Sequence, residues 1–159
     1  MKIFFIFTVF FSSFSYSEEF TLVCEGERNV RSFIGKGLND IHFEPVILKV
    51  KKDSMEYIGV NSGRRYSFNN KEYTASKRPP HEDIKIQEYY EITPKIIKAS
   101  QIITDTGNSE ESSISRISLN IDRLTGKLNE IESISNKKTL VKTTSNDFQA
   151  YCKIEDNSY

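Results

Sequence analysis

The segment Phe148–Glu155, FQAYCKIE, alternates between apolar and polar side chains without interruption. Its apolar positions are Phe148, Ala150, Cys152 and Ile154. Strict alternation is typical of a half-buried β-strand, because successive side chains of a strand point to opposite faces. The segment therefore predicts a strand near the end of the chain, with Cys152 on its buried face.

A second segment, Phe20–Cys24 (FTLVC), shows a similar but less strict pattern more than a hundred residues earlier, because Val23 on its other face is apolar. Phe20, Leu22 and Cys24 share one face, and Thr21 lies on the other. This pattern predicts a strand whose buried face carries the second of the two cysteines in the chain.

The first seventeen residues have the three-part layout of a secretory signal peptide. Lys2 gives a positive start, Ile3–Phe11 is apolar, and small residues follow up to Ser17. The apolar run is too short for a membrane span, which needs about 20 residues. We predict a cleaved signal peptide over 1–17 and a single exported domain over 18–159, periplasmic or extracellular, without an integral membrane segment. The alternative is that Phe4–Phe11 forms a buried strand.

The two cysteines lie near opposite ends of the predicted mature chain. Disulfides persist in the oxidising compartments that exported proteins reach, so an even pair indicates one bridge. We predict that Cys24 and Cys152 form this bridge and join the first strand to the last. The alternative is two separate buried thiols.

The residues between the cysteines also read as short β segments. Ile117, Leu119 and Ile121 alternate with polar residues, and a turn around Gly126 leads into Leu128. Turn signals recur about every 8–12 residues, as in an antiparallel meander. The fold class predicted is all-β, a single antiparallel β-barrel or β-sandwich of about eight to ten short strands.

Two features leave the assignment open. In Ile41–Val50 the alternation slips at Pro45, which predicts a bulge, an edge or a break, with Ile41 and Phe43 pointing inward and His42 outward. Segments 95–104 and 127–134 have apolar spacings that fit a strand or a helix. A strand is favoured for 127–134, because its Asn and Ser residues are weak helix formers.

Three further stretches combine into a recognisable layout: Thr21–Gly26 (TLVCEG), Leu119–Leu128 (LNIDRLTGKL) and Tyr151-Cys152. This layout resembles small exported two-cysteine bacterial proteins of unassigned function. The resemblance implies a lipocalin-like or similar barrel, and it assigns no catalytic residue.

The segment Ser62–Tyr66 (SGRRY) matches a Ser-Gly-x-x-Tyr pattern. It resembles the periplasmic lysozyme inhibitors of the membrane-bound/periplasmic C-type family. The resemblance implies a partner loop containing Ser62, Gly63 and Tyr66, and inhibition of a lytic enzyme such as lysozyme. The Trp-containing stretch of that family has no counterpart, since this chain has no Trp.

Composition excludes other classes. Lys and Arg total 22 and Asp and Glu total 22, so the chain lacks the basic excess of a nucleic-acid binder. With two His and two Cys, it has too few ligands for a structural zinc site beside a disulfide. We therefore predict no nucleic-acid partner, no metal and no cofactor.

The sequence contains no catalytic motif of the common kinds. The Gly-x-Ser-x-Gly elbow, the Gly-x-Gly-x-x-Gly fingerprint and the phosphate-binding loop are all missing. His42 and His81 are the only imidazoles, and neither has a motif around it. We predict a non-enzymatic binding or structural domain whose partner is a small apolar ligand or a protein. The remaining alternative is an exported hydrolase.

Overall fold

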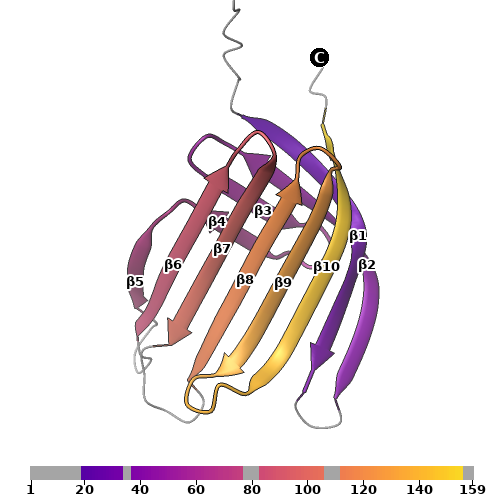
Figure 1. Cartoon of the computed structure of the whole chain (residues 1–159). Helices are drawn as coiled ribbons and strands as arrows, with labels where there is room; N and C mark the ends of the chain where they lie inside the picture. The colour runs from indigo at the N-terminus through magenta and orange to yellow at the C-terminus, as the bar shows by residue number, and fades with distance from the viewer. Residues whose placement is uncertain (1–18, 34–36, 77–82, 106–111, 156–159) are drawn as a thin grey trace, which may run out of the picture.

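The computed structural model describes residues 19–33, 37–76, 83–105 and 112–155 (Figure 1). These residues form ten β-strands and no helix. The prediction of an all-β, barrel-like fold is confirmed, and the predicted signal peptide over 1–17 lies outside the described residues. The strands are β1 (Phe20–Ser32), β2 (Leu38–Val50), β3 (Met55–Gly59), β4 (Arg65–Phe68), β5 (Glu72–Ser76), β6 (Asp83–Ile92), β7 (Ile96–Asp105), β8 (Ser113–Asp122), β9 (Lys127–Asn136) and β10 (Lys142–Ile154).

All ten described strands belong to one antiparallel sheet in the order β4-β3-β2-β1-β10-β9-β8-β7-β6-β5. The first and last strands, β1 and β10, are therefore neighbours inside the sheet. The two edges, β4 and β5, are consecutive in the chain. The sheet curls into a half-barrel, so that β3 and β4 lie behind β6 and β7 in Figure 1.

The short connection between β4 and β5 crosses from one edge of the sheet towards the other. The Asn70 side chain donates to the Tyr90 carbonyl over 2.8 Å and accepts from the Tyr90 amide over 2.6 Å. The Glu88 amide donates to the Lys71 carbonyl over 2.8 Å. These bonds satisfy backbone groups that an open edge of β6 would otherwise expose.

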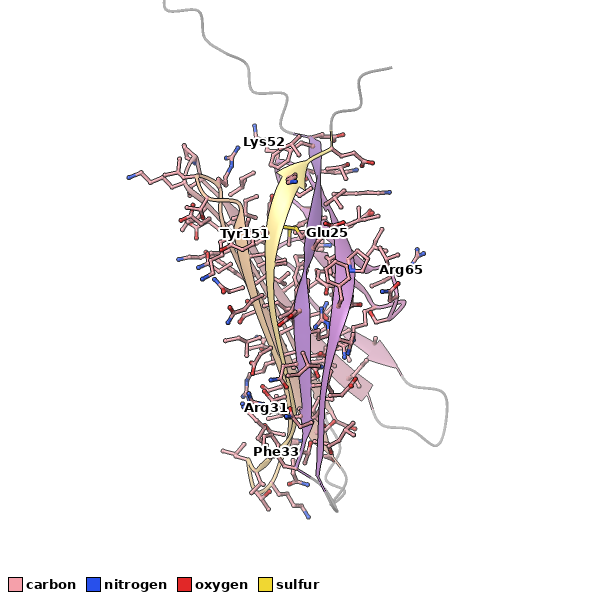
Figure 2. All side chains as sticks on the ribbon, turned by 90° about the vertical axis from the view of Figure 1, so that its right-hand side faces the viewer. Glu25, Arg31, Phe33, Lys52, Arg65 and Tyr151 are labelled. Carbon is pink, nitrogen blue, oxygen red and sulfur yellow. A yellow bond between two sulfur atoms is a disulfide. The ribbon has the colours of Figure 1, made fainter. Side chains whose placement is uncertain are left out.

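The curl of the sheet gives it two facing layers, with β3 and β4 in one and β6 and β7 in the other (Figure 1). The core lies on the concave side, where side chains fill the space between these two layers (Figure 2). Apolar side chains from β1 to β4 and from β6 to β10 pack together there, among them the fully buried Tyr57, Phe68 and Phe148. The layers diverge towards the end of the half-barrel where Lys52 lies (Figure 2).

The predicted disulfide is present. Cys24 of β1 and Cys152 of β10 are directly opposed in the ladder, with an S–S distance of 2.06 Å and a Cα–Cα distance of 3.9 Å. The bridge spans a sequence separation of 128 residues and joins the first described strand to the last, as predicted.

The predicted orientation of Ile41 and Phe43 is wrong. Both side chains are 58% exposed, and Glu44 between Phe43 and Pro45 is fully buried. The β2 register against β1 is unbroken through Pro45, so no bulge occurs there. The β3 ladder ends at Val46, and the Pro45 carbonyl accepts from the Val60 amide, so the missing N–H of Pro45 faces a local edge.

The two ambiguous segments are both strands, since 95–104 falls mainly in β7 and 127–134 falls in β9. In β9 the buried positions alternate as Leu128, Glu130 and Glu132, with Ile131 exposed. The inward positions Glu130 and Glu132 are acidic instead of apolar, so the two-residue period of the strand is hidden in the sequence. The remaining apolar residues then have a spacing that resembles that of a helix.

Candidate functional site

A cluster of charged side chains is buried in the half-barrel, and we call it the Arg28 cluster: Arg28, Glu44, Tyr57 and Glu130. Arg28 Nε donates to Glu44, and Nη1 donates to Glu130 over 2.7 Å. Arg28 Nη2 donates to the Tyr57 hydroxyl over 2.5 Å, and that hydroxyl donates to Glu130 over 2.8 Å. The guanidinium also lies 4.6 Å from the centre of the Phe148 ring.

The mutual contacts of the Arg28 cluster shift its ionisations. Burial alone would lower the pKa of Arg28, but the hydrogen bond and charge of Glu130 raise it above its ordinary value. Burial would raise the pKa of Glu44, but hydrogen bonds from Ser62 and Arg28 lower it below its ordinary value. Burial and the charge of Glu130 raise the pKa of Tyr57. These shifts favour a charged Arg28, a charged Glu44 and a neutral Tyr57 phenol.

The Arg28 cluster connects four strands of the sheet through buried hydrogen bonds and ion pairs. Its members come from β1, β2, β3 and β9, and each is at most 1% exposed. Charges buried so completely must satisfy one another, and these carboxylates already accept hydrogen bonds from the guanidinium, the phenol and Ser62. Burial leaves no room beside them for a substrate.

The predicted partner loop contacts two carboxylates, Glu44 of the Arg28 cluster and Glu132. Ser62 donates its hydroxyl to the buried Glu44, and the Tyr66 hydroxyl donates to Glu132 over 3.1 Å. Gly63 is exposed at the turn with a φ of 66°. Two of the three predicted loop residues therefore use their hydroxyls inside the protein. The lysozyme-inhibitor hypothesis stays a prediction, which a lysozyme assay with the purified mature chain tests.

The histidines offer no catalytic arrangement in the described part of the chain. His42 Nδ1 lies 3.1 Å from Asp40 Oδ2, with both side chains exposed to solvent. His81 lies outside the described residues. The described residues bring no three His, Cys, Asp or Glu side chains together as a metal site. The hydrolase alternative stays a prediction.

A hollow opens at the end of the half-barrel where the two layers diverge, and we call it the mouth hollow. The turn Asp122–Gly126 between β8 and β9 lies there against β10. The Cys152 amide donates to the Gly126 carbonyl over 2.8 Å. Gly126 has a φ of 72°, and a Cβ atom on it would lie 2.6 Å from the Cys152 carbonyl oxygen. Only glycine allows this approach.

The mouth hollow has a volume of about 460 Å³. Its floor consists of core residues, and its rim carries exposed apolar side chains. Leu124 is 79% exposed and Ile154 is 65% exposed. The apolar lining residues are Phe20, Leu22, Pro94, Ile97, Ile121, Leu124, Cys152 and Ile154.

Two charged residues of the rim are engaged by the protein itself. Asp122 Oδ1 accepts from the amides of Leu124 and Thr125 over 2.9 and 3.0 Å, and these bonds lower its pKa below the ordinary value. Arg123 Nη1 donates to the Thr93 carbonyl over 2.7 Å, with its guanidinium 5.5 Å from the centre of the Phe20 ring. The rim charges hold the turn in place beside an apolar hollow.

No protein family, curated protein or solved structure matched this chain. The described residues also include no helix with the length and apolarity of a membrane span.

Sequence reasoning did not find the mouth hollow or the Arg28 cluster. Leu22 and Ile121 are predicted only as inward positions of strands, and Arg28, Glu44 and Glu130 are not singled out. The available signal was the break in alternation at Glu44-Pro45, where an acidic residue occupies the inward register.

Proposed function

We propose that the mature chain is an exported, non-enzymatic binding domain that holds a small apolar ligand in the mouth hollow. The observation that carries the proposal is the hollow itself, whose volume of about 460 Å³ falls within the roughly 300–1,000 Å³ typical of small-molecule sites. Most of its lining residues are apolar and the two charged ones, Asp122 and Arg123, are engaged by the protein, so the ligand gains free energy chiefly by leaving water.

The rest of the interior restricts the ligand to this end of the half-barrel. Tyr57, Phe68 and Phe148 are fully buried further in, and the buried Arg28 guanidinium contacts both the Tyr57 hydroxyl and the Phe148 ring. A ligand therefore occupies the mouth and does not enter along the length of the sheet. The floor residues Ile97 and Ile121 are 1% exposed and packed, so the hollow is formed without a ligand.

Two observations support export. The residues before the domain have the layout of a signal peptide, and the Cys24–Cys152 bridge is compatible with an oxidising compartment.

The test is a fluorescence titration of the mature chain with the apolar probe N-phenyl-1-naphthylamine. We expect saturable binding with enhanced emission at micromolar protein. Leu124→Glu introduces a carboxylate at the rim and should weaken probe binding about tenfold. Leu140→Glu is the matched control, because Leu140 is a 65% exposed leucine in the turn between β9 and β10 and does not line the hollow.

The absence of saturable binding would contradict the proposal. Equal weakening by Leu124→Glu and Leu140→Glu would also contradict it, since the probe would then bind apolar surface in general.

A further inference from the structure

The convex face of the sheet carries a second hollow, and we propose that it binds a neutral oligosaccharide. We call it the outer trough. It has a volume of about 770 Å³ and lies over β9, β10, β1 and β2. Figure 2 looks onto this face, with β10 and β1 in the middle of the view and Tyr151, Glu25 and Arg31 labelled.

The strand registers place polar side chains in the middle of the outer trough and apolar ones at its sides. In one row Asn29 of β1 and Asp147 of β10 are paired, with Ile41 and Ile131 next to them on β2 and β9. Ile41 and Ile131 are 58% and 54% exposed. The trough is therefore polar along its centre and has isoleucine walls at this row.

The next two rows continue the trough. Glu27 pairs with Gln149, which in turn pairs with Asn129. Tyr151 follows, 66% exposed, between Glu25 and Lys127. From Asp147 to Tyr151 the strand rises about 13 Å at roughly 3.3 Å per residue, which gives the trough the length of a short oligosaccharide.

One atom in the trough lacks a partner that it needs. Asn29 Oδ1 is buried from solvent and accepts no hydrogen bond from the described residues. A ligand hydroxyl therefore reaches this oxygen only if the neighbouring side chains of the trough move aside. Because a buried acceptor left unsatisfied costs free energy, a hydroxyl that then donates to it gains more than it would at an exposed acceptor.

The chemistry of the trough fits sugars better than other ligands. Carboxylates accept, and carboxamides both donate and accept, so Asp147, Gln149 and Asn129 can bond adjacent hydroxyls that themselves do both. The flat ring of Tyr151 offers an apolar surface to the C–H face of a pyranose. The carboxylates of Glu25, Glu27 and Asp147 outnumber the two cations that also line the trough, Arg31 and Lys127, so phosphates and sulfates gain no net attraction and a neutral glycan is favoured.

The outer trough is independent of the mouth hollow. Side chains of β10 alternate between the two sides of the sheet, so Tyr151 lines the trough and Cys152 lines the mouth hollow. A ligand at one site does not touch the other, and the two proposals can fail separately.

The test is isothermal titration calorimetry of the mature chain with cellohexaose, maltohexaose and chitohexaose as separate probes. We expect at least one of them to bind at millimolar concentration or below. Tyr151→Ala should weaken that binding about tenfold through loss of the stacked ring. Tyr89→Ala is the matched control, because Tyr89 is a 47% exposed tyrosine outside the trough and should leave binding unchanged.

Asn29→Leu separates binding from stability. We expect it to weaken the oligosaccharide about fivefold or more without lowering the thermal midpoint, because the replaced oxygen has no internal partner to lose. A lowered midpoint with unchanged affinity would indicate a purely structural role and would overturn the assignment of Asn29.

Failure of all three probes at millimolar concentration would overturn the oligosaccharide proposal and assign the face to a protein partner instead. Naphthylamine binding in the mouth hollow should be the same with and without saturating oligosaccharide, and in Tyr151→Ala. Competition between the two probes would contradict the separation of the sites.

Discussion

Replacing Arg28 by methionine tests whether the buried ion cluster braces the half-barrel. The substitution keeps an unbranched side chain beside Phe148 but removes the guanidinium donors to Glu44 and Glu130. Among the described residues, Glu44 then keeps only the hydrogen bonds from Ser62, and Glu130 keeps only the one from the Tyr57 hydroxyl. Two carboxylates that are at most 1% exposed then lose the cation that they share. Breaking a buried pair in this way costs about 3–5 kcal/mol of the free energy of unfolding. At about 2–4 °C per kcal/mol, the thermal midpoint should fall by about 6–20 °C.

The loss should depend on pH in a definite direction. In the intact protein Glu44 has a lowered pKa, so its stabilising contribution is fully present above the ordinary carboxyl pKa and is lost as the pH falls through the lowered value. Without Arg28, burial favours the protonated form of the two carboxyl groups. Keeping them protonated costs the least free energy at acidic pH. The deficit of Arg28→Met should therefore be largest near neutral pH and should shrink as the pH is lowered.

Urea denaturation followed by far-ultraviolet circular dichroism measures this, at neutral pH and at a mildly acidic pH. Arg31→Met is the control, because Arg31 lies three positions further along β1 with an exposed side chain, and its loss should be within about 0.5 kcal/mol of zero. The reasoning is refuted if Arg28→Met costs less than about 1 kcal/mol, or if its deficit grows as the pH falls.

Three further predictions follow from named contacts. Cys24→Ser should lower the free energy of unfolding by about 2–5 kcal/mol in urea, and two free thiols in the unreduced wild-type mass spectrum would contradict the bridge. Gly26→Ala should cost about 1–3 kcal/mol or more, because the added methyl would lie 1.9 Å from the Gln149 carbonyl oxygen, and wild-type stability would contradict that close approach. Burial raises the pKa of Tyr57 and Tyr66, and it raises that of Tyr90 to about 12, so their contribution is present below the ordinary phenol pKa and is lost as the pH rises through the raised values. An ultraviolet titration in which all tyrosines of the folded protein ionise near pH 10 would contradict this.

The parts of the fold that sequence reasoning predicted are those where apolar residues alternate cleanly. In β10, the alternation of Phe148, Ala150 and Cys152 predicts both the strand and the inward direction of the thiol. In β1, Leu22 and Cys24 predict the same. The pairing of first and last strands is expected from the even cysteine pair of an exported chain and from a barrel-like architecture, because alternation alone does not show which strands are neighbours.

The parts that sequence reasoning missed depend on partners distant in the chain. The sequence does not single out Arg28, Glu44 or Glu130, since nothing local shows that one cation meets two carboxylates from other strands. The same cluster explains why the predicted inward orientation of Ile41 and Phe43 in β2 is wrong. Glu44 faces inward to meet Arg28, so its neighbours in alternation face outward. The mouth hollow and the outer trough are likewise made by side chains of several strands, and an alternation pattern does not show whether the space between them is filled.

The most direct test of the proposed function is a methyl-resolved NMR titration of the isoleucine- and leucine-labelled mature chain with N-phenyl-1-naphthylamine. We predict saturable shifts of the methyl groups of Leu22, Ile97, Ile121, Leu124 and Ile154, which line the mouth hollow. The methyl groups of Ile41, Ile131 and Leu140 lie elsewhere and should stay unchanged. Shifts confined to those three residues, or no shifts at saturating probe, would contradict a ligand site at the mouth of the half-barrel.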